Sequence, residues 1–323
     1  MTARTVAFGL GGALAIGALA AFPLIDSPFY LKLVTRIMIM GIFAMSLDLL
    51  VGYTGLVSLG HAAFFGIAGY ALALMSPQYE AASLWLTLPA VLGCTALVAL
   101  VIGALALRTS GVYFIMATLA FAQMLFYFVH DAKFTGGSDG LYLMLKPDAT
   151  LFGWRPFDLD QPVHLYYVVL GCLLAGYVVL RRILASPFGH ALVGIKTNEH
   201  RMRSLGFATY RYKLASFVLA GTLAGLAGYL AALQHGFINP EQLGWHMSGS
   251  ALMMVILGGM GTLVGGVVGA MAMISLQEVF SGMTKHWNLL MGGFVVLTAL
   301  FLPRGLAGLF ARRNTSSGEQ SHG

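Results

Sequence analysis

Long apolar stretches separated by short polar segments run along the whole chain, and this pattern predicts an all-α integral membrane protein. We expect one transmembrane domain over residues 1–323. Most of the stretches are close to the length that crosses a bilayer as a helix. The predicted membrane segments are residues 6–25, 33–52, 54–75, 84–107, 111–130, 164–180, 211–234, 247–280 and 288–302.

The first segment, residues 6–25, follows Arg4 and has two interpretations. It is either a first membrane helix or a secretory signal peptide, because Ala18-Leu19-Ala20 resembles a cleavage site. The membrane helix is favoured, since the rest of the chain is also embedded in the membrane.

The stretch 247–280 is too long for one ordinary span, and glycines interrupt it over residues 258–266. It is either one long tilted helix or two short helices that break at these glycines. The broken pair gives about ten membrane passes, with broken or re-entrant helices and both termini in the cytoplasm. This arrangement leaves Lys32 and Arg36 near the outer side, as an exception to the positive-inside rule.

Composition agrees with lipid as the main solvent. Hydrophobic residues make up 58% of the chain and charged residues only 9%, against about a quarter in a soluble domain. The spacings Gly221-x3-Gly225 and Gly261-x3-Gly265-x3-Gly269 indicate helices that pack closely. Cys94 and Cys172 lie within apolar stretches and lack metal-ligand spacing, so they are expected to be inert packing residues.

The net charge of +6 reflects membrane topology and does not indicate nucleic-acid binding. Residues 131–163 form the longest polar loop, with five Asp against three Lys or Arg and many turn residues. Because this loop lacks a positive bias, we expect it outside the cell. The basic tail, residues 303–323, is expected in the cytoplasm.

Residues 181–213 are the one strongly basic region, with seven Lys or Arg against the single acid Glu199. Short basic loops lie on the cytoplasmic side of membrane proteins. The region also predicts a short helix, which Asn198 caps, Glu199 stabilises in the first turn and Gly206 ends. We therefore expect a soluble partner to dock here.

A glycine-rich break separates the segments 33–52 and 54–75, and irregular backbone at membrane depth is tolerated only beside protein or a water-filled cavity. Free backbone groups at such a break can bind a polar or zwitterionic solute; the alternative is a plain tight turn. Asp48 and His61 flank the break, either in contact with a solute or as partners between helices. The candidate pathway residues are Gly52, Tyr53, Thr54, Gly55, Ser58, Gly60 and His61.

Catalytic motifs are absent from the sequence. It contains no HExxH and no P-loop, so the chain is not expected to hydrolyse nucleotide or to be an enzyme. Ser248 and Ser250 near His246 raise the alternative of an intramembrane serine hydrolase. Adjacent positions on one helix point apart, however, and a nucleophile needs its base within hydrogen-bond distance.

The break carries a resemblance to a known family. Residues 52–66, Gly-Tyr-Thr-Gly-Leu-Val-Ser-Leu-Gly-His-Ala-Ala-Phe-Phe-Gly, resemble the signature of the permeases of branched-chain amino acid ABC importers, specifically the LivM-type subunit. The resemblance extends over about residues 30–310. It includes Ser186-Pro-Phe-Gly189, Asn198-Glu199 and Leu205-Gly206, which resemble the loop that contacts the ATPase, and Pro303-Arg-Gly-Leu306 near the end.

The resemblance implies the ABC importer permease fold and several partners. These are a homologous LivH-type permease, two cytoplasmic ATPase subunits, and a periplasmic or lipid-anchored solute-binding protein. The chain itself would bind no cofactor or metal, and the partner subunits would use ATP. Coupling to the ATPases is expected at Gly189, Asn198, Glu199, Arg201, Arg203, Leu205 and Gly206.

The chain departs from the family in the coupling loop. Two small residues usually follow the Glu closely, where this chain has Arg201 and Met202. Either the packing in the ATPase cleft differs, or the ATPase partner has a complementary acidic surface.

The solute is expected to be a branched-chain or related amino acid, carried across the inner membrane. Urea, short amides or aromatic acids are the alternatives, since similar permeases carry them. A secondary transporter or channel is the alternative from another class. It would need coupling-ion residues at mid-membrane and no docking loop.

Overall fold

The computed structural model describes residues 17–24, 27–77, 79–150, 157–301, 305, 306 and 308. Most of the predicted segment 6–25 and nearly all of the tail 303–323 lie outside the described residues, so the predictions made for them stay predictions.

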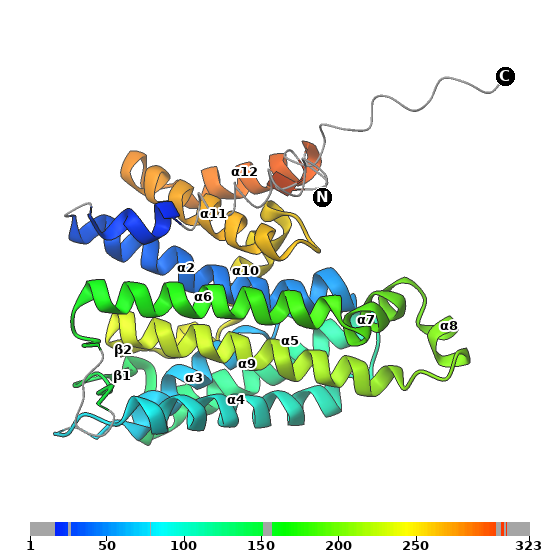
Figure 1. Ribbon diagram of the computed structural model, residues 1–323, viewed down its shortest axis with the longest axis horizontal. Coiled ribbons are helices and arrows are strands. Elements are labelled where there is room, and N and C mark those ends of the chain that lie inside the picture. Colours follow the sequence, from blue (N-terminus) through cyan, green and yellow to red (C-terminus); the bar gives the residue numbers. More distant parts are fainter. Residues whose placement is uncertain are drawn as a thin grey trace.

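Helices make up most of the described chain (Figure 1). They are α2 (Pro28–Asp48), α3 (Ala62–Met75), α4 (Leu84–Ala106), α5 (Val112–Asp131), α6 (Pro162–Ala185), α7 (Pro187–Thr197), α8 (Glu199–Ser204), α9 (Thr209–His235), α10 (Trp245–Gly258), α11 (Leu263–Met283) and α12 (Trp287–Phe301). A π-helical turn, η2 (Leu49–Thr54), extends α2, and short 3-10 turns include η5 (Pro240–Leu243).

Six helical stretches in the described part of the chain are long and apolar enough to cross a membrane, and α3, α10 and α12 are shorter apolar helices. The predicted all-α membrane class is therefore confirmed. Of the two arrangements expected for 247–280, the structure has the broken pair. α10 ends at Gly258, α11 begins at Leu263, and the two helices pack against each other.

Several predicted boundaries were wrong. α3 begins only at Ala62, because residues 55–60 are not helical. α6 continues to Ala185, so Arg181 and Arg182 lie on its last turns and not in a loop. The remainder of the basic region folds into two helices, α7 and α8, where the sequence predicted one.

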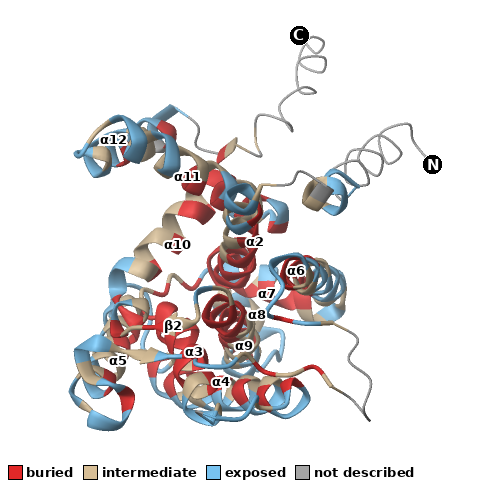
Figure 2. Ribbon diagram, turned by 90° about the vertical axis from the view of Figure 1, so that its left-hand side faces the viewer, coloured by how far each residue is buried: buried red, intermediate tan, exposed pale blue. Residues whose placement is uncertain are grey.

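The α2 helix is the centre of the bundle. Nearly every residue from Met38 to Leu50 is buried, and α2 contacts α6, α9, α10 and α11 (Figure 2). A helix that is apolar on all sides is expected to be surrounded by other helices. The continuation of α2 through η2 therefore carries the glycine break into the interior of the protein.

Small residues allow the neighbouring helices to approach closely. A Cβ on Gly225 of α9 would collide with Thr95 of α4, and one on Gly228 would collide with the backbone of Phe65 in α3. Between α10 and α11, a Cβ on Gly269 would collide with the backbone of Met254. The close packing expected from the small-residue spacings is confirmed.

The polar segments gather at the two ends of the bundle. α7 and α8 lie at one end, whereas the described part of loop 131–163 lies at the other, to the left in Figure 1. There strands β1 (Leu141–Tyr142) and β2 (Phe237–Ile238) form an antiparallel pair. The backbone of Asp148 also bonds to that of Ala82 and Leu84, at 2.7 and 2.9 Å. The loop is thus attached to the helix ends around it.

Replacing Gly228 by Leu is expected to destabilise the protein by about 1–3 kcal/mol, because the new side chain would force α3 and α9 apart. The measurement is the thermal unfolding midpoint of the purified protein in detergent. Gly171→Leu on α6 is the matched control, since a Cβ there meets nothing within 4 Å. Equal unfolding midpoints for the two variants would contradict the packing described.

Candidate functional site

The break after α2 is built from a π-helical turn and a left-handed glycine. Gly55 has φ 77°, a conformation that other residues adopt only with strain, and an extended segment leads from it to α3. A Cβ on Gly52 would collide with the carboxylate of Asp48 and the backbone of Gly261. Both glycines are therefore required by the backbone itself.

Three other elements hold this turn. The ammonium of Lys196 in α7 donates to the carbonyl of Gly52 at 2.5 Å. The hydroxyl of Thr54 lies 3.1 Å from that of Ser216 in α9 and also donates to Leu49 O, at 3.0 Å. The bonds to Gly52 O and Leu49 O satisfy backbone carbonyls that the helix end leaves without partners, as burial in a membrane protein requires. The bond to Ser216 attaches Thr54 to α9.

The third element is the connection between α10 and α11. The buried carboxylate of Asp48 accepts a 2.8 Å hydrogen bond from the backbone N–H of Gly261. The other carboxylate oxygen has no hydrogen-bond partner among the described residues. Asp48 thus has the interhelical role that the sequence offered as one alternative.

The second half of the predicted pathway is packed against neighbouring helices. Ser58 accepts a hydrogen bond from the N–H of Gly60 at 3.3 Å, and a Cβ on Gly60 would collide with the backbone of Thr118 in α5. His61 is fully buried, and its Nε2 lies 2.8 Å from the hydroxyl of Ser46. In this conformation His61 joins two helices, and its contact with a solute stays a prediction.

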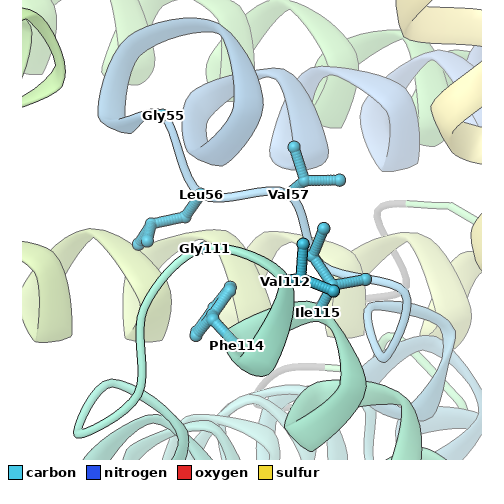
Figure 3. Close-up of a pocket in the computed structure, with 7 residues that line it drawn as sticks. All are labelled: Gly55, Leu56, Val57, Gly111, Val112, Phe114 and Ile115. Carbon is cyan, nitrogen blue, oxygen red and sulfur yellow. The ribbon is translucent and has the colours of Figure 1, made fainter.

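A pocket of about 270 Å³ opens beside the break (Figure 3). The extended segment after α2 forms one wall and the start of α5 forms the other. The lining residues are Gly55, Leu56, Val57, Gly111, Val112, Phe114 and Ile115. Of these, only Gly55 was predicted as a site residue. Leu56 and Val57 lie within the motif of residues 52–66 but were not named as site residues, and nothing in the sequence marked the residues at the start of α5.

The basic region has the local structure that its capping residues predicted. Asn198 accepts a 2.9 Å hydrogen bond from the N–H of Arg201 and begins α8, and Gly206 with φ 89° follows its end. At the corner between α6 and α7, a Cβ on Gly189 would collide with the backbone of Leu184. The corner therefore requires glycine at that position.

The two arginines predicted for coupling, Arg201 and Arg203, differ in their ion pairs. Glu199 accepts hydrogen bonds from Arg203 at 2.7 Å, from Lys213 and from Thr209. Arg203 is thus bound within the chain. Arg201 is exposed and has no side-chain partner among the described residues, and Leu205 nearby is 67% exposed. A cation and an apolar side chain are left available to a partner.

Partial burial raises the pKa of Glu199, but the hydrogen bonds from Lys213, Arg203 and Thr209 and the charge of Lys213 outweigh it, so its pKa is lowered overall. The ionised carboxylate therefore stabilises the attachment of α8 to α9. This contribution is present above the usual pKa of a Glu and is lost as the pH falls through the lowered value.

The serine hydrolase alternative finds no support in the geometry. Ser248 accepts a hydrogen bond from the N–H of Ala62 at 2.9 Å, and Ser250 donates to the backbone carbonyl of His246 at 3.0 Å. Neither serine is bonded to an imidazole among the described residues. Among all the residues that the structure describes, no three or more His, Cys, Asp or Glu side chains form a group that could hold a metal ion.

Sequence reasoning missed the residues that contact the break from a distance. Lys196, Ser216 and Gly261 lie 144, 162 and 213 positions away from their partners. Lys196 was visible only as one of several basic residues in its region. Nothing in the sequence distinguished Ser216 from other helix serines.

The described chain combines helices long and apolar enough to cross a membrane, a central helix interrupted at Gly52 to Gly55, and a basic helical end. Residues 29–300 match the family described as branched-chain amino acid transport system, permease component. The chain belongs to this family of ABC transporter permeases, as the resemblance predicted.

Individual relatives agree with the family match. The chain is 30% identical over 307 residues to the high-affinity branched-chain amino acid transport system permease protein LivM of Salmonella typhimurium and to that of Escherichia coli. Each alignment covers 88% of this chain and 72% of the relative. The autoinducer 2 import system permease protein LsrC of Klebsiella pneumoniae is 33% identical over 154 residues, 45% of this chain and 44% of LsrC. No solved structure gives a significant match.

Replacing Glu199 by Gln is expected to speed amide hydrogen exchange in α8 about two- to fivefold at neutral pH, because partly exposed ion pairs contribute up to about 1 kcal/mol. Hydrogen–deuterium exchange with mass spectrometry measures this directly. Glu278→Gln, at an exposed position of α11, is the control. Unchanged exchange in α8 of the Glu199 variant would show that the ion pairs do not hold this helix.

Proposed function

We propose that the chain is the membrane subunit of an ATP-driven importer that moves branched-chain or related amino acids across the inner membrane. The observation that carries this proposal is the family match over residues 29–300, together with the two LivM relatives, whose names specify branched-chain amino acid transport. Urea, short amides and aromatic acids stay the alternative solutes.

In this proposal the chain crosses the membrane about ten times, and both termini lie in the cytoplasm. Residues 181–213 and 303–323 face the cytoplasm in this proposal, and residues 131–163 face outward. The positions of the basic helices and of loop 131–163 at opposite ends of the bundle support it (Figure 1). The division of 247–280 into α10 and α11 also supports it, because ten passes require two helices in this stretch.

The energy comes from partners in this proposal. Two ATPase subunits dock on the basic end and hydrolyse ATP, while this chain binds no nucleotide or other cofactor. A homologous LivH-type permease pairs with it in the membrane, and a solute-binding protein delivers the solute from outside. The exposed Arg201 and Leu205 offer an ATPase a charged and an apolar contact. The other coupling residues, such as Asn198 and Gly189, shape that surface.

The solute route passes the glycine break at residues 52–61 in this proposal. Here a short stretch of backbone leaves the helical pattern, and small movements of η2 would expose its N–H and C=O groups to a zwitterion. In the present conformation Gly52 packs against Gly261, and Ser58, Gly60 and His61 are covered by neighbouring helices. The route is closed at this level and opens when η2 moves away from the α10–α11 connection.

ATP dependence distinguishes this proposal from a secondary transporter or channel. The test reconstitutes the chain with its partner permease, ATPases and binding protein in proteoliposomes and measures solute accumulation. Uptake that requires ATP, and that favours Leu, Ile or Val over urea, amides and aromatic acids, supports the proposal. Uptake by the chain alone without ATP overturns it.

Replacing Arg201 by Glu is expected to reduce uptake about tenfold, with expression intact, because it reverses the one helical cation of α8 that is free for a partner. ATP hydrolysis and uptake are measured together in the reconstituted complex. Lys285→Glu, exposed at the α11–α12 turn, is the control. Arg203→Glu should also loosen α8, since it breaks the ion pair with Glu199. Normal coupled uptake by the Arg201 variant would reject a docking role.

Replacing Gly52 and Gly55 by Leu is expected to abolish uptake while the ATPases still assemble with the permease. Neither position accepts a side chain without moving the turn, and Gly55 adds backbone strain. Uptake and co-purification of the ATPases are measured on the same preparations. Gly93→Leu, which meets nothing within 4 Å, is the matched control. Wild-type kinetics in the double variant would exclude the break from the route.

A further inference from the structure

Lys196 connects the basic end of the protein to the glycine break. It lies in the last turn of α7, and its ammonium donates to the carbonyl of Gly52. Its aliphatic stem lies over the second glycine, since a Cβ on Gly55 would be only 3.1 Å from Lys196 Cγ. One side chain thus touches both glycines of the break, and it comes from the region predicted to meet the ATPases.

The same turn is bound from its other side. Asp48, one helical turn before Gly52, accepts the hydrogen bond from Gly261 in the α10–α11 connection. Lys196 and Asp48 have side chains of opposite charge, and both bind at this turn. A movement of α7 that withdraws the ammonium therefore removes a partner of Gly52 and a counter-charge of Asp48 together.

The junction leaves one buried polar atom without a partner among the described residues. One oxygen of the buried Asp48 carboxylate lacks a partner, and an unsatisfied buried charged group is unfavourable. Water or another donor can satisfy that oxygen once η2 and Gly261 separate. The hydrogen bonds of Lys196 and Asp48 thus stabilise the closed junction, and the unpaired carboxylate oxygen of Asp48 destabilises it.

We propose that Lys196 is the positioning residue that carries the displacement of the docking helices to η2 and, through Asp48 and Gly261, to the α10–α11 pair. This inference rests on the proposed function, because it needs an ATPase that moves α7. In the closed state Lys196 holds η2 against Gly261. When the ATPases displace α7, the bond to Gly52 breaks and the turn is released.

A static role for Lys196 makes a different prediction. If the bond only anchors the basic helices, its loss should loosen the docking surface, so that less ATPase co-purifies and less ATP is hydrolysed. If Lys196 itself contacts the ATPase, assembly should fall in the same way. If Lys196 transmits movement, assembly and hydrolysis should persist while fewer solute molecules move per ATP.

The experiment compares wild type, Lys196→Met, Lys196→Gln and Lys196→Arg in the complete complex in proteoliposomes, with Lys285→Met as control. It measures leucine accumulation, ATP hydrolysis and the ATPase that co-purifies. Lys196→Met and Lys196→Gln are expected to lower the ratio of leucine moved to ATP hydrolysed about tenfold, which corresponds to the loss of about one charged hydrogen bond. Lys196→Arg keeps the charge and donors and should restore most of the ratio.

The outcomes distinguish a failure of the inference about Lys196 from a failure of the proposed transport function. A wild-type ratio in Lys196→Met or Lys196→Gln overturns the inference, and so does a parallel loss of assembly, hydrolysis and uptake in both. A wild-type complex that shows no ATP-dependent uptake of any of the tested solutes overturns the proposed function instead.

Discussion

A backbone N–H or C=O without a partner is costly inside a bilayer, so a membrane helix can break only where protein supplies the missing bonds. The α2 helix lies in the centre of the bundle and breaks at Gly52 to Gly55, next to α7. Lys196 of α7 donates to the carbonyl of Gly52, and the hydroxyl of Thr54 donates to the carbonyl of Leu49. The hydroxyl of Ser216 in α9 bonds to that of Thr54, and Asp48 binds the α10–α11 connection. One interruption in one helix therefore fixes how three other parts of the chain sit around it, and its glycines leave no room for substitution.

The bonds at the break link the two regions proposed to be functional, the basic helices and the glycine break. The basic helices α7 and α8, which we propose to be the docking site of the ATPases, lie at one end of the bundle (Figure 1), and α7 contacts the turn η2 at the break. The single acid of the basic region is used inside the chain, where Glu199 binds Arg203 and Lys213. The same region thus has an inner set of charges that hold it to α9 and an exposed cation, Arg201, for a partner. The basic end contacts the break directly, through Lys196 of α7.

The membrane class and the cap and stop residues of α8 were predictable, because each depends on local pattern: hydrophobic length, and Asn198 with Gly206. For 247–280, the glycine run marked the position of a break but left one tilted helix as the alternative. Gly52 and Gly55 were found by the same local signal. Their partners were not, since a pairing such as Asp48 with Gly261 spans 213 positions and depends on how helices pack. The extension of α6 past Arg181 was missed because two adjacent arginines were interpreted as the start of a polar loop. Arginines can also lie in the last turns of a membrane helix, since their long side chains extend to the membrane surface.

The central claim is that the docking helices and the α10–α11 connection move relative to each other when ATP is used. Spin labels at Thr197→Cys and Met260→Cys, both exposed, report this distance in a background with Cys94 and Cys172 replaced by Ala. Pulsed electron paramagnetic resonance on the complete complex, with and without ATP, should give two distance populations whose proportions change with nucleotide. An identical distance distribution in every nucleotide state, in a complex that still imports solute, would contradict the account.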